Sequence, residues 1–245
     1  MKKFKIWSMM MLVVMALSMI VACGGDDDNT PPNPNNPQTP GGNGPENGGK
    51  DRSSYWDDNL NPSTKNNNPY AVDMGLSVSW ANKNLGTSKD YEPGGSYGWA
   101  DPTGCYYIND LSYYPWGEIP SKIAGTNYDA ATWNWGSHWR LPTKLEVEEL
   151  INNSTIEWVK DAESGGKMLL KFTSKINGNF IFLSSTNIRR GKQVSNDGRE
   201  GGYWTGDLSQ NSDNAWTLSF YGNAEVKTYQ RERSNGLSIR PVYVK

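Results

Sequence analysis

The sequence predicts an α+β domain over residues 70–245, with one or two helices, short antiparallel strands and long loops. One segment carries a complete set of helix signals. Several short runs alternate apolar and polar residues between Gly or Asn turns, which is typical of antiparallel strands. The remaining segments are rich in Gly, Tyr and Trp and have no helical or strand period, so we expect loops. Few helices and many antiparallel strands favour the α+β class.

The best-signalled helix begins after Thr143. Thr143 and Glu146 fit a capping box, in which each side chain accepts a hydrogen bond from the other residue's backbone N–H. The apolar residues that follow have the spacing of one helical face: Val147, Leu150 and Ile151. Asn152-Asn153 is the expected end of this helix. A second, shorter helical turn is expected over residues 129–132.

Two strands are expected over residues 168–173 and 180–184. They flank Asn177-Gly178, a dipeptide that suits a two-residue type I′ hairpin turn.

Three further strands are expected nearer the end of the sequence. In residues 216–220, Trp, Leu and Phe alternate with Thr and Ser, which predicts one buried face. Gly222-Asn223 then turns the chain into residues 224–230. The last strand is expected over residues 238–244, where Pro241 indicates a sheet edge or a bulge.

Residues 1–22 have the form of a cleaved export signal. Three lysines near the start are followed by a largely apolar stretch from Trp7 to Ala22. This stretch is shorter than the roughly 20 residues that span a hydrocarbon core, so we expect removal and not insertion. Small residues before a single Cys are typical of lipoprotein signals. We predict cleavage before Cys23, with lipid on its sulfur and on the new amino terminus, anchoring the chain to a membrane.

Residues 23–69 are expected to form a disordered tether that begins at the lipidated Cys23. Residues 24–50 contain no Val, Ile, Leu, Phe, Trp or Tyr, so they cannot bury enough apolar area to offset the entropy of ordering. They are rich in Pro, Gly and Asn, as flexible linkers are.

An acidic triplet directly follows the lipid site: Asp26, Asp27 and Asp28. It resembles the export signal of Bacteroidota lipoproteins that are displayed on the outer cell surface. We therefore predict an outer-membrane location with the domain facing the cell exterior. Two alternatives stay open, namely that the acids only keep the tether soluble and that the domain faces the periplasm.

Several motifs resemble one known family. They occur in order along the chain: Gly75-Leu76-Ser77-Val78-Ser79-Trp80-Ala81 and Asn84-Leu85-Gly86, then Trp135-Gly136 and Trp139-Arg140-Leu141-Pro142-Thr143 with Glu146 and Glu149-Leu150, then residues 171–183, and finally Tyr203-Trp204 and Gly236-Leu237-Ser238-Ile239-Arg240-Pro241-Val242. Together they resemble the Fibrobacter succinogenes major paralogous domain, which is abundant in Bacteroidota surface lipoproteins. The resemblance covers about residues 70–244.

The resemblance implies a C-type-lectin-like fold, distantly similar to the formylglycine-generating sulfatase-modifying domain. It implies no defined activity, because the family is largely uncharacterised and a fold does not fix a function. Some relatives carry one Cys after the opening Trp-Ala and another after the helix. Residues 82–84 and 153–155 contain no Cys here, so that disulfide is missing.

The residue inventory argues against several chemistries. Without residues 1–22 the formal charge falls from −2 to −5, since three lysines and no acid are lost, so we expect no nucleic-acid partner. His138 is the only histidine, and Cys105 is the only cysteine once Cys23 is acylated, which leaves neither a zinc site nor a two-cysteine oxidase. We interpret His138 as a hydrogen-bonding loop residue and expect no cofactor.

Carboxylates and turn oxygens offer weaker alternatives. No pair of acids is singled out for glycoside hydrolysis. The candidate acids are Asp57-Asp58, Glu146, Glu148-Glu149, Asp161 and Glu163. Asn196-Asp197-Gly198 and Asp213-Asn214 carry calcium-type oxygens but are also ordinary turn sequences, and we favour the turn. We therefore expect no enzyme and no metal.

The aromatic residues give the best functional signal. There are 11 Trp and 13 Tyr against 5 Phe, and Trp and Tyr stack on sugar C–H edges while their polar atoms stay wet. Trp99, Trp116 and Trp133 lie in Gly-, Tyr- and Asn-rich loops and are the candidate ligand-binding residues. We expect a binding or adhesion domain for an extracellular glycan or protein. The alternative is a structural component of a cell-envelope or fimbrial assembly.

Overall fold

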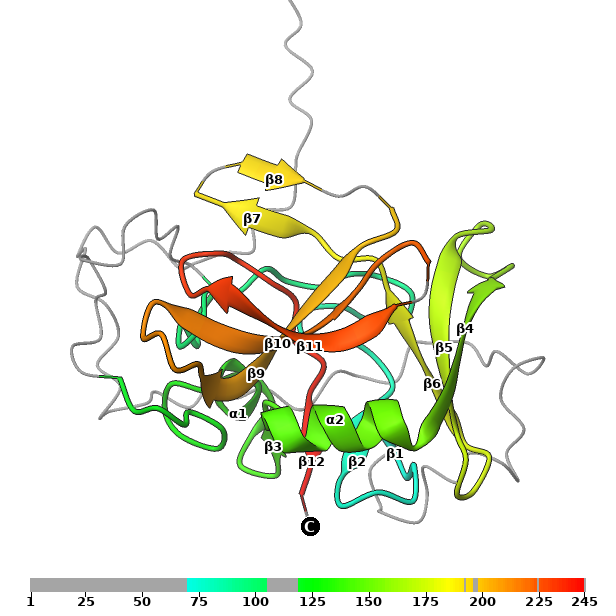
Figure 1. The fold of residues 1–245 in the computed structure, drawn as a ribbon, viewed down its shortest axis with the longest axis horizontal. Coiled ribbons are helices and arrows are strands. Elements are labelled where there is room, and N and C mark those ends of the chain that lie inside the picture. Colours follow the sequence, from blue (N-terminus) through cyan, green and yellow to red (C-terminus); the bar gives the residue numbers. More distant parts are fainter. Residues whose placement is uncertain (1–69, 105–118, 192, 196–197, 224, 245) are drawn as a thin grey trace, which may run out of the picture. The chain divides into compact units, whose positions relative to one another are not determined.

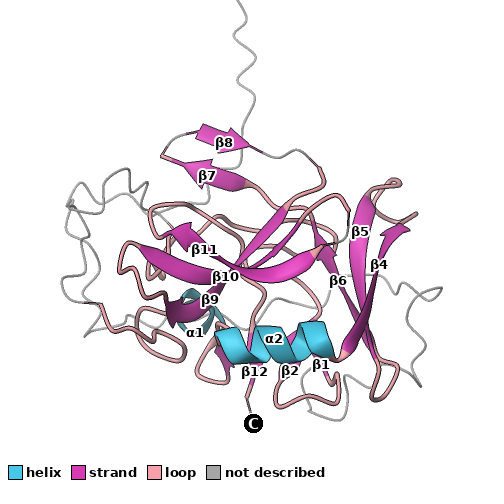
Figure 2. Ribbon diagram, viewed as in Figure 1, coloured by secondary structure: helices cyan, strands magenta, loops and turns pink. Residues whose placement is uncertain are grey.

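The computed structural model describes residues 70–244, apart from 105–118, 192, 196–197 and 224. The described part contains two helices and several small antiparallel sheets, which confirms the α+β class (Figure 2). No helix among these residues is long and apolar enough to cross a membrane. The predicted signal, Cys23, the acidic triplet, the tether, Cys105 and Trp116 lie outside the described residues.

The central sheet has three antiparallel strands in the order β11-β10-β9 (Figure 1). They are β9 (Gly201–Leu208), β10 (Asn214–Phe220) and β11 (Val226–Glu232). The prediction of one buried face for residues 216–220 is wrong. Thr217 and Ser219 are as fully buried as Phe220, whereas Trp216 is only half-buried. Both faces are covered because an apolar core packs against each side of the sheet.

A second antiparallel sheet has the order β4-β5-β6. Its strands are β4 (Ser154–Lys160), β5 (Met168–Ser174) and β6 (Phe180–Ser184). The β5–β6 hairpin is confirmed, but the two-residue type I′ turn is wrong. The loop spans residues 175–178, closed by Ser174 N–H donating to the Asn179 carbonyl at 2.8 Å. Asn177 Nδ2 also donates to the Asp73 carbonyl at 2.9 Å, and this tertiary contact favours the longer loop.

A third sheet brings together segments from both ends of the domain. Its order is β1-β2-β12-β3, with β1 (Ala71–Val72), β2 (Ser79–Ala81), β3 (Trp139–Arg140) and β12 (Val242–Tyr243). The predicted strand over residues 238–244 is reduced to β12. Pro241 does not mark a sheet edge, since β12 lies between β2 and β3. The Pro241 carbonyl accepts from Ala81 N–H at 2.9 Å, a bond that needs no proline N–H.

The remaining elements are a hairpin and two helices. Strands β7 (Ile188–Arg190) and β8 (Gln193–Ser195) pair only with each other among the described strands. Helix α2 (Lys144–Asn152) has the predicted capping box and ends at Asn153. Helix α1 (Ala130–Trp135) begins one residue after the predicted start and is longer than the predicted turn.

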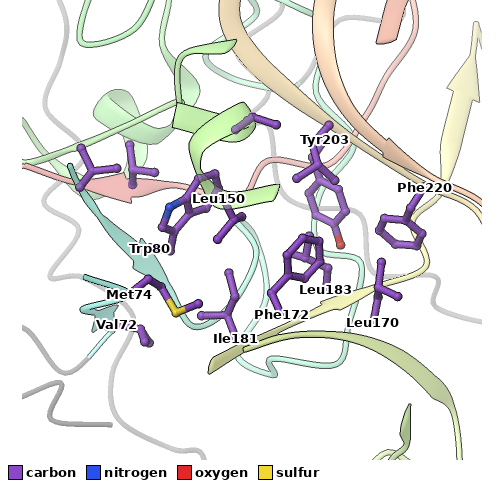
Figure 3. Packing of buried hydrophobic residues seen from close by; sticks show 14 residues of the cluster. Val72, Met74, Trp80, Leu150, Leu170, Phe172, Ile181, Leu183, Tyr203 and Phe220 are labelled. Carbon is purple, nitrogen blue, oxygen red and sulfur yellow. The ribbon is translucent and has the colours of Figure 1, made fainter. Parts of the chain in front are cut away.

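Two apolar cores lie on opposite faces of the central sheet. Neighbouring residues of β9 point to opposite sides, so Tyr203 enters the first core and Trp204 the second. The first core gathers side chains from α2, β2, β5, β6, β10 and β12, including Trp80, Leu150 and Phe220 (Figure 3). The second core contains α1 and loop residues. A domain of short elements thus obtains most of its burial from contacts between elements.

Candidate ligand-binding surface

The outer face of the third sheet carries an aromatic cluster. Val242 pairs with Trp80 and points into the first core, so its neighbour Tyr243 points to the opposite face. Tyr243 lies directly opposite Trp139 of β3 on that face. Trp135 at the end of α1 and His138 complete the group. We call Trp135, His138, Trp139 and Tyr243 the aromatic cluster.

The rings of the aromatic cluster form one continuous chain of contacts. The Trp135 and Trp139 centroids are 5.0 Å apart with an 83° interplanar angle, and those of Trp139 and Tyr243 are 5.2 Å apart at 65°. His138 stacks on Tyr243 at 5.7 Å and 29°. Edge-to-face and stacked pairs at these distances stabilise each other beyond the area they bury. The cluster is therefore a preformed surface.

The amount of exposed ring differs along the cluster. Trp139 is buried beside Ala71 and Ala81, which form the floor of this face. Trp135 and Tyr243 are half-buried, and His138 is exposed. A ligand would therefore meet parts of the Trp135, Tyr243 and His138 rings, while Trp139 supports them from beneath.

Local backbone structure places Trp135 against Trp139. Helix α1 ends at Gly136, whose φ of 90° is a left-handed value that favours glycine. Trp139 N–H then donates to the Gly136 carbonyl at 3.0 Å, which returns the chain toward the helix. Thr132 Oγ1 donates to the Trp139 carbonyl at 2.8 Å and fixes that return.

His138 is held by the end of the third sheet. Its Nδ1 donates to the Val244 carbonyl at 3.0 Å, and Val244 N–H donates to the His138 carbonyl at 2.8 Å. The predicted role of His138 as a hydrogen-bonding loop residue is confirmed. With Nδ1 as the donor, Nε2 is the acceptor atom of the neutral ring.

A buried carboxylate organises the loop beneath the aromatic cluster. Asp129 caps α1 through Ala131 and Thr132 N–H, at 2.8 and 3.2 Å, and also accepts from Gly125 and Leu141 N–H, both at 2.8 Å. Burial raises the pKa of Asp129 to about 6, although these four hydrogen bonds act in the opposite direction. Asp129 thereby ties the start of α1 to the residue that follows β3.

The three tryptophans predicted to bind a ligand differ in where they lie. The prediction that Trp99 is an exposed ligand-binding residue is wrong, because its side chain is 0% exposed in the second core. Its Nε1 donates to the Thr205 carbonyl at 2.8 Å, a bond that nothing in the local sequence signals. Trp133 is half-buried on α1 and lies two residues from Trp135, hence on a different side of the helix. Trp116 lies outside the described residues.

Glu146 and Asp161, two of the candidate acids, have structural contacts, whereas Asp57-Asp58 lies outside the described residues. Glu146 completes the capping box and binds Arg140 through both oxygens, at 2.6 and 2.9 Å. Burial alone would raise the pKa of Glu146, but Arg140 and the Thr143 N–H together hold it below its ordinary value. Asp161 accepts from Ser164 N–H at 2.7 Å within a turn. In the described part of the chain, no group of three His, Cys, Asp or Glu residues could hold a metal ion.

Only part of the aromatic cluster could be predicted from the sequence. Trp135 and Trp139 belong to the sequence motifs described above and Tyr243 to a predicted strand, but the contact of Trp139 with Tyr243 joins positions about a hundred residues apart. No periodicity reports such a contact. No family model, curated protein or solved structure matches this chain.

Proposed function

We propose that the chain is a lipoprotein of the outer membrane whose domain, of C-type-lectin-like fold, binds extracellular glycans without catalysing a reaction. The aromatic cluster is the observation that carries this proposal. Its half-exposed rings are held by their neighbours before a ligand arrives, so little ordering entropy opposes binding. Exposed aromatic faces with polar edges suit the C–H surfaces of sugars.

The proposed anchor and location rest on the sequence alone. The lipid on Cys23 attaches the chain to the membrane, and the triplet Asp26-Asp27-Asp28 directs the domain to the cell exterior. The tether expected from the sequence, residues 23–69, lies between the lipid anchor and the domain. Such an arrangement suits a receptor that meets polymers outside the cell.

A glycan array followed by titration calorimetry on the strongest hit tests the proposed function. Tyr243→Ala and His138→Ala each remove a ring that solvent reaches, and each is expected to weaken binding about two- to tenfold, from about 0.5–1.5 kcal/mol per ring contact. Leu145→Ala is the matched control, since Leu145 is exposed on α2 and outside the aromatic cluster. Thermal melts of each variant separate lost binding from lost folding.

Two results would contradict the proposed function. The first is an array without any signal above that of a denatured sample. The second is a glycan whose affinity is the same for wild type, Tyr243→Ala and His138→Ala, because that glycan would bind elsewhere.

A further inference from the structure

Strand β11 is an open edge of the central sheet. It is seven residues long, Val226–Glu232, and pairs with β10 along its whole length. No described strand pairs with its other side. An edge of this length presents a row of backbone donors and acceptors to any extended chain.

The direction of each β11 backbone group follows from the bonds it makes. Tyr221 N–H donates to the Glu225 carbonyl at 3.2 Å, and Arg233 N–H donates to the Asp213 carbonyl at 2.9 Å, so the odd-numbered residues face β10. Because these directions alternate along a strand, Thr228 and Gln230 present their N–H and C=O groups outward. Among the described residues, none hydrogen-bonds to these outward groups.

The side chains above this edge form a cationic and aromatic row. Lys227, Tyr229 and Arg231 lie at alternate positions and therefore on one face. Tyr229 is 48% exposed. Lys227 and Arg231 each hold one carboxylate, those of Glu225 and Glu200.

Arg231 retains one donor without a partner among the described residues. Its Nη2 binds Glu200, but its Nε is buried without a hydrogen-bond partner in the described structure. A guanidinium can present Nε and Nη to a carboxylate as a pair of parallel donors. Because Nε is buried, a second carboxylate reaches this donor only if the Arg231 side chain turns outward from Glu200.

Charge argues against a second copy of this chain as the occupant. Antiparallel pairing of two β11 strands about Tyr229 would set Lys227 of one copy opposite Arg231 of the other, twice. Like charges at directly opposite positions destabilise a strand pair. The same row favours a strand with carboxylates at the two outer positions.

We propose that the β11 edge binds an extended acidic peptide segment of another protein by strand addition. The segment carries Asp or Glu opposite Lys227 and Arg231 and an apolar residue opposite Tyr229. Its backbone exchanges N–H···O bonds with Thr228 and Gln230. The interaction adds a protein partner to the proposed glycan receptor and uses a different surface, so either proposal can fail without the other.

A synthetic peptide tests the predicted register. The probe matches β11 in length, with Glu at its second and sixth positions, Val at its fourth and Thr elsewhere. In antiparallel pairing its third and fifth N–H groups point to Gln230 and Thr228. N-methylation of these two positions is expected to weaken binding roughly tenfold or more, since two backbone hydrogen bonds are lost. N-methylation of the second and sixth positions is expected to leave the affinity unchanged.

Variants of the full chain provide the second half of the test. Gln230→Pro removes one outward N–H at a position where an edge strand tolerates proline, and is expected to weaken binding; Gln230→Ala keeps the N–H and is the control. The Lys227→Glu variant is expected to bind a probe with Lys at its sixth position, opposite residue 227, more tightly than the original probe. Thermal melts report whether each variant is folded.

Three outcomes would overturn strand addition of an acidic segment. One is the absence of fluorescence anisotropy change with the labelled probe and folded wild type. Another is equal weakening by both N-methylation patterns. The third is a dimer in sedimentation equilibrium that Gln230→Pro dissociates, which would make a second copy the occupant.

Discussion

The guanidinium of Arg240 carries a charge into the interior of the domain. It is 1% exposed, and its hydrogen bonds end on the neutral oxygens of Asn84, Ala81 and Phe182, at 2.8, 2.9 and 2.8 Å. Burial lowers the pKa of Arg240 to about 10, which leaves it charged at neutral pH. A buried cation that lacks acceptors is strongly disfavoured. The segments that contain Arg240, Ala81 with Asn84, and Phe182 must therefore be in place together.

At the same scale, Asp129 predicts a pH dependence of stability. Its folded pKa of about 6 exceeds its ordinary value of 3.8, so the folded state binds more protons between these values. Stability from this group is therefore complete below about pH 4 and is lost as the pH rises through about 6, by about 3 kcal/mol at about 1.4 kcal/mol per pKa unit. Denaturant unfolding of wild type and Asp129→Asn across this range measures the difference.

The stability of the Asp129→Asn variant should not show this loss as the pH rises. The variant should also be less stable overall, because its amide nitrogen cannot accept the N–H bonds of Gly125 and Leu141. Asp213→Asn removes an exposed carboxylate and is the control. A wild-type profile that Asp129→Asn does not alter would show that Asp129 has an ordinary pKa.

At the scale of elements, α2 is specified by its neighbouring residues and is also held by tertiary contacts. Its capping box is complete in the structure, and Glu146 of that box also binds Arg140 of β3. Glu149 accepts from Ser77 N–H at 3.1 Å, which ties the helix to the loop before β2. The helix thus holds two other segments, β3 and the loop before β2.

We expect removal of the α2 cap to lower the free energy of unfolding modestly. Thr143→Ala deletes the oxygen that accepts Glu146 N–H, and the expected loss is about 1 kcal/mol in the free energy of unfolding. Thr143→Ser keeps an acceptor and should stay close to wild type. Leu145→Ala, in the same helix but 74% exposed, should change stability little. Equal effects of Thr143→Ala and Leu145→Ala would contradict a role for the cap.

The elements show why some features could be predicted and others could not. The α2 boundaries and the β5–β6 hairpin follow from neighbouring residues, which the sequence displays directly. The Asn177 loop and the short β12 depend on Asp73 and β2, far away in the chain, so local turn and strand signals were insufficient. The failure at Trp99 has the same cause, because its burial depends on Thr205.

At the scale of the whole molecule, the two proposed binding surfaces belong to one domain. The aromatic cluster lies on the third sheet, and the β11 edge belongs to the central sheet. A glycan and a protein strand would thus occupy different sheets. One receptor can then hold a polymer while attached to an envelope partner.

The proposed lipid anchor and export triplet predict the distribution of the protein in cells. Cys23→Ala should abolish labelling with radioactive palmitate and release the protein from the membrane fraction. Replacement of Asp26, Asp27 and Asp28 by Ala should keep the lipid but protect the domain from proteinase added to intact cells, whereas wild type is cleaved. Protection of the wild type would instead place the domain in the periplasm and favour an envelope partner.

The position of β12 has a consequence for how the protein is made. β12 pairs with β2 on one side and β3 on the other, so the third sheet is incomplete until Val242 and Tyr243 are present. A ribosome has by then synthesised the other strands that the structure describes. The third sheet is therefore the last of the described sheets to be completed during synthesis, and β2 and β3 lack their shared partner until then.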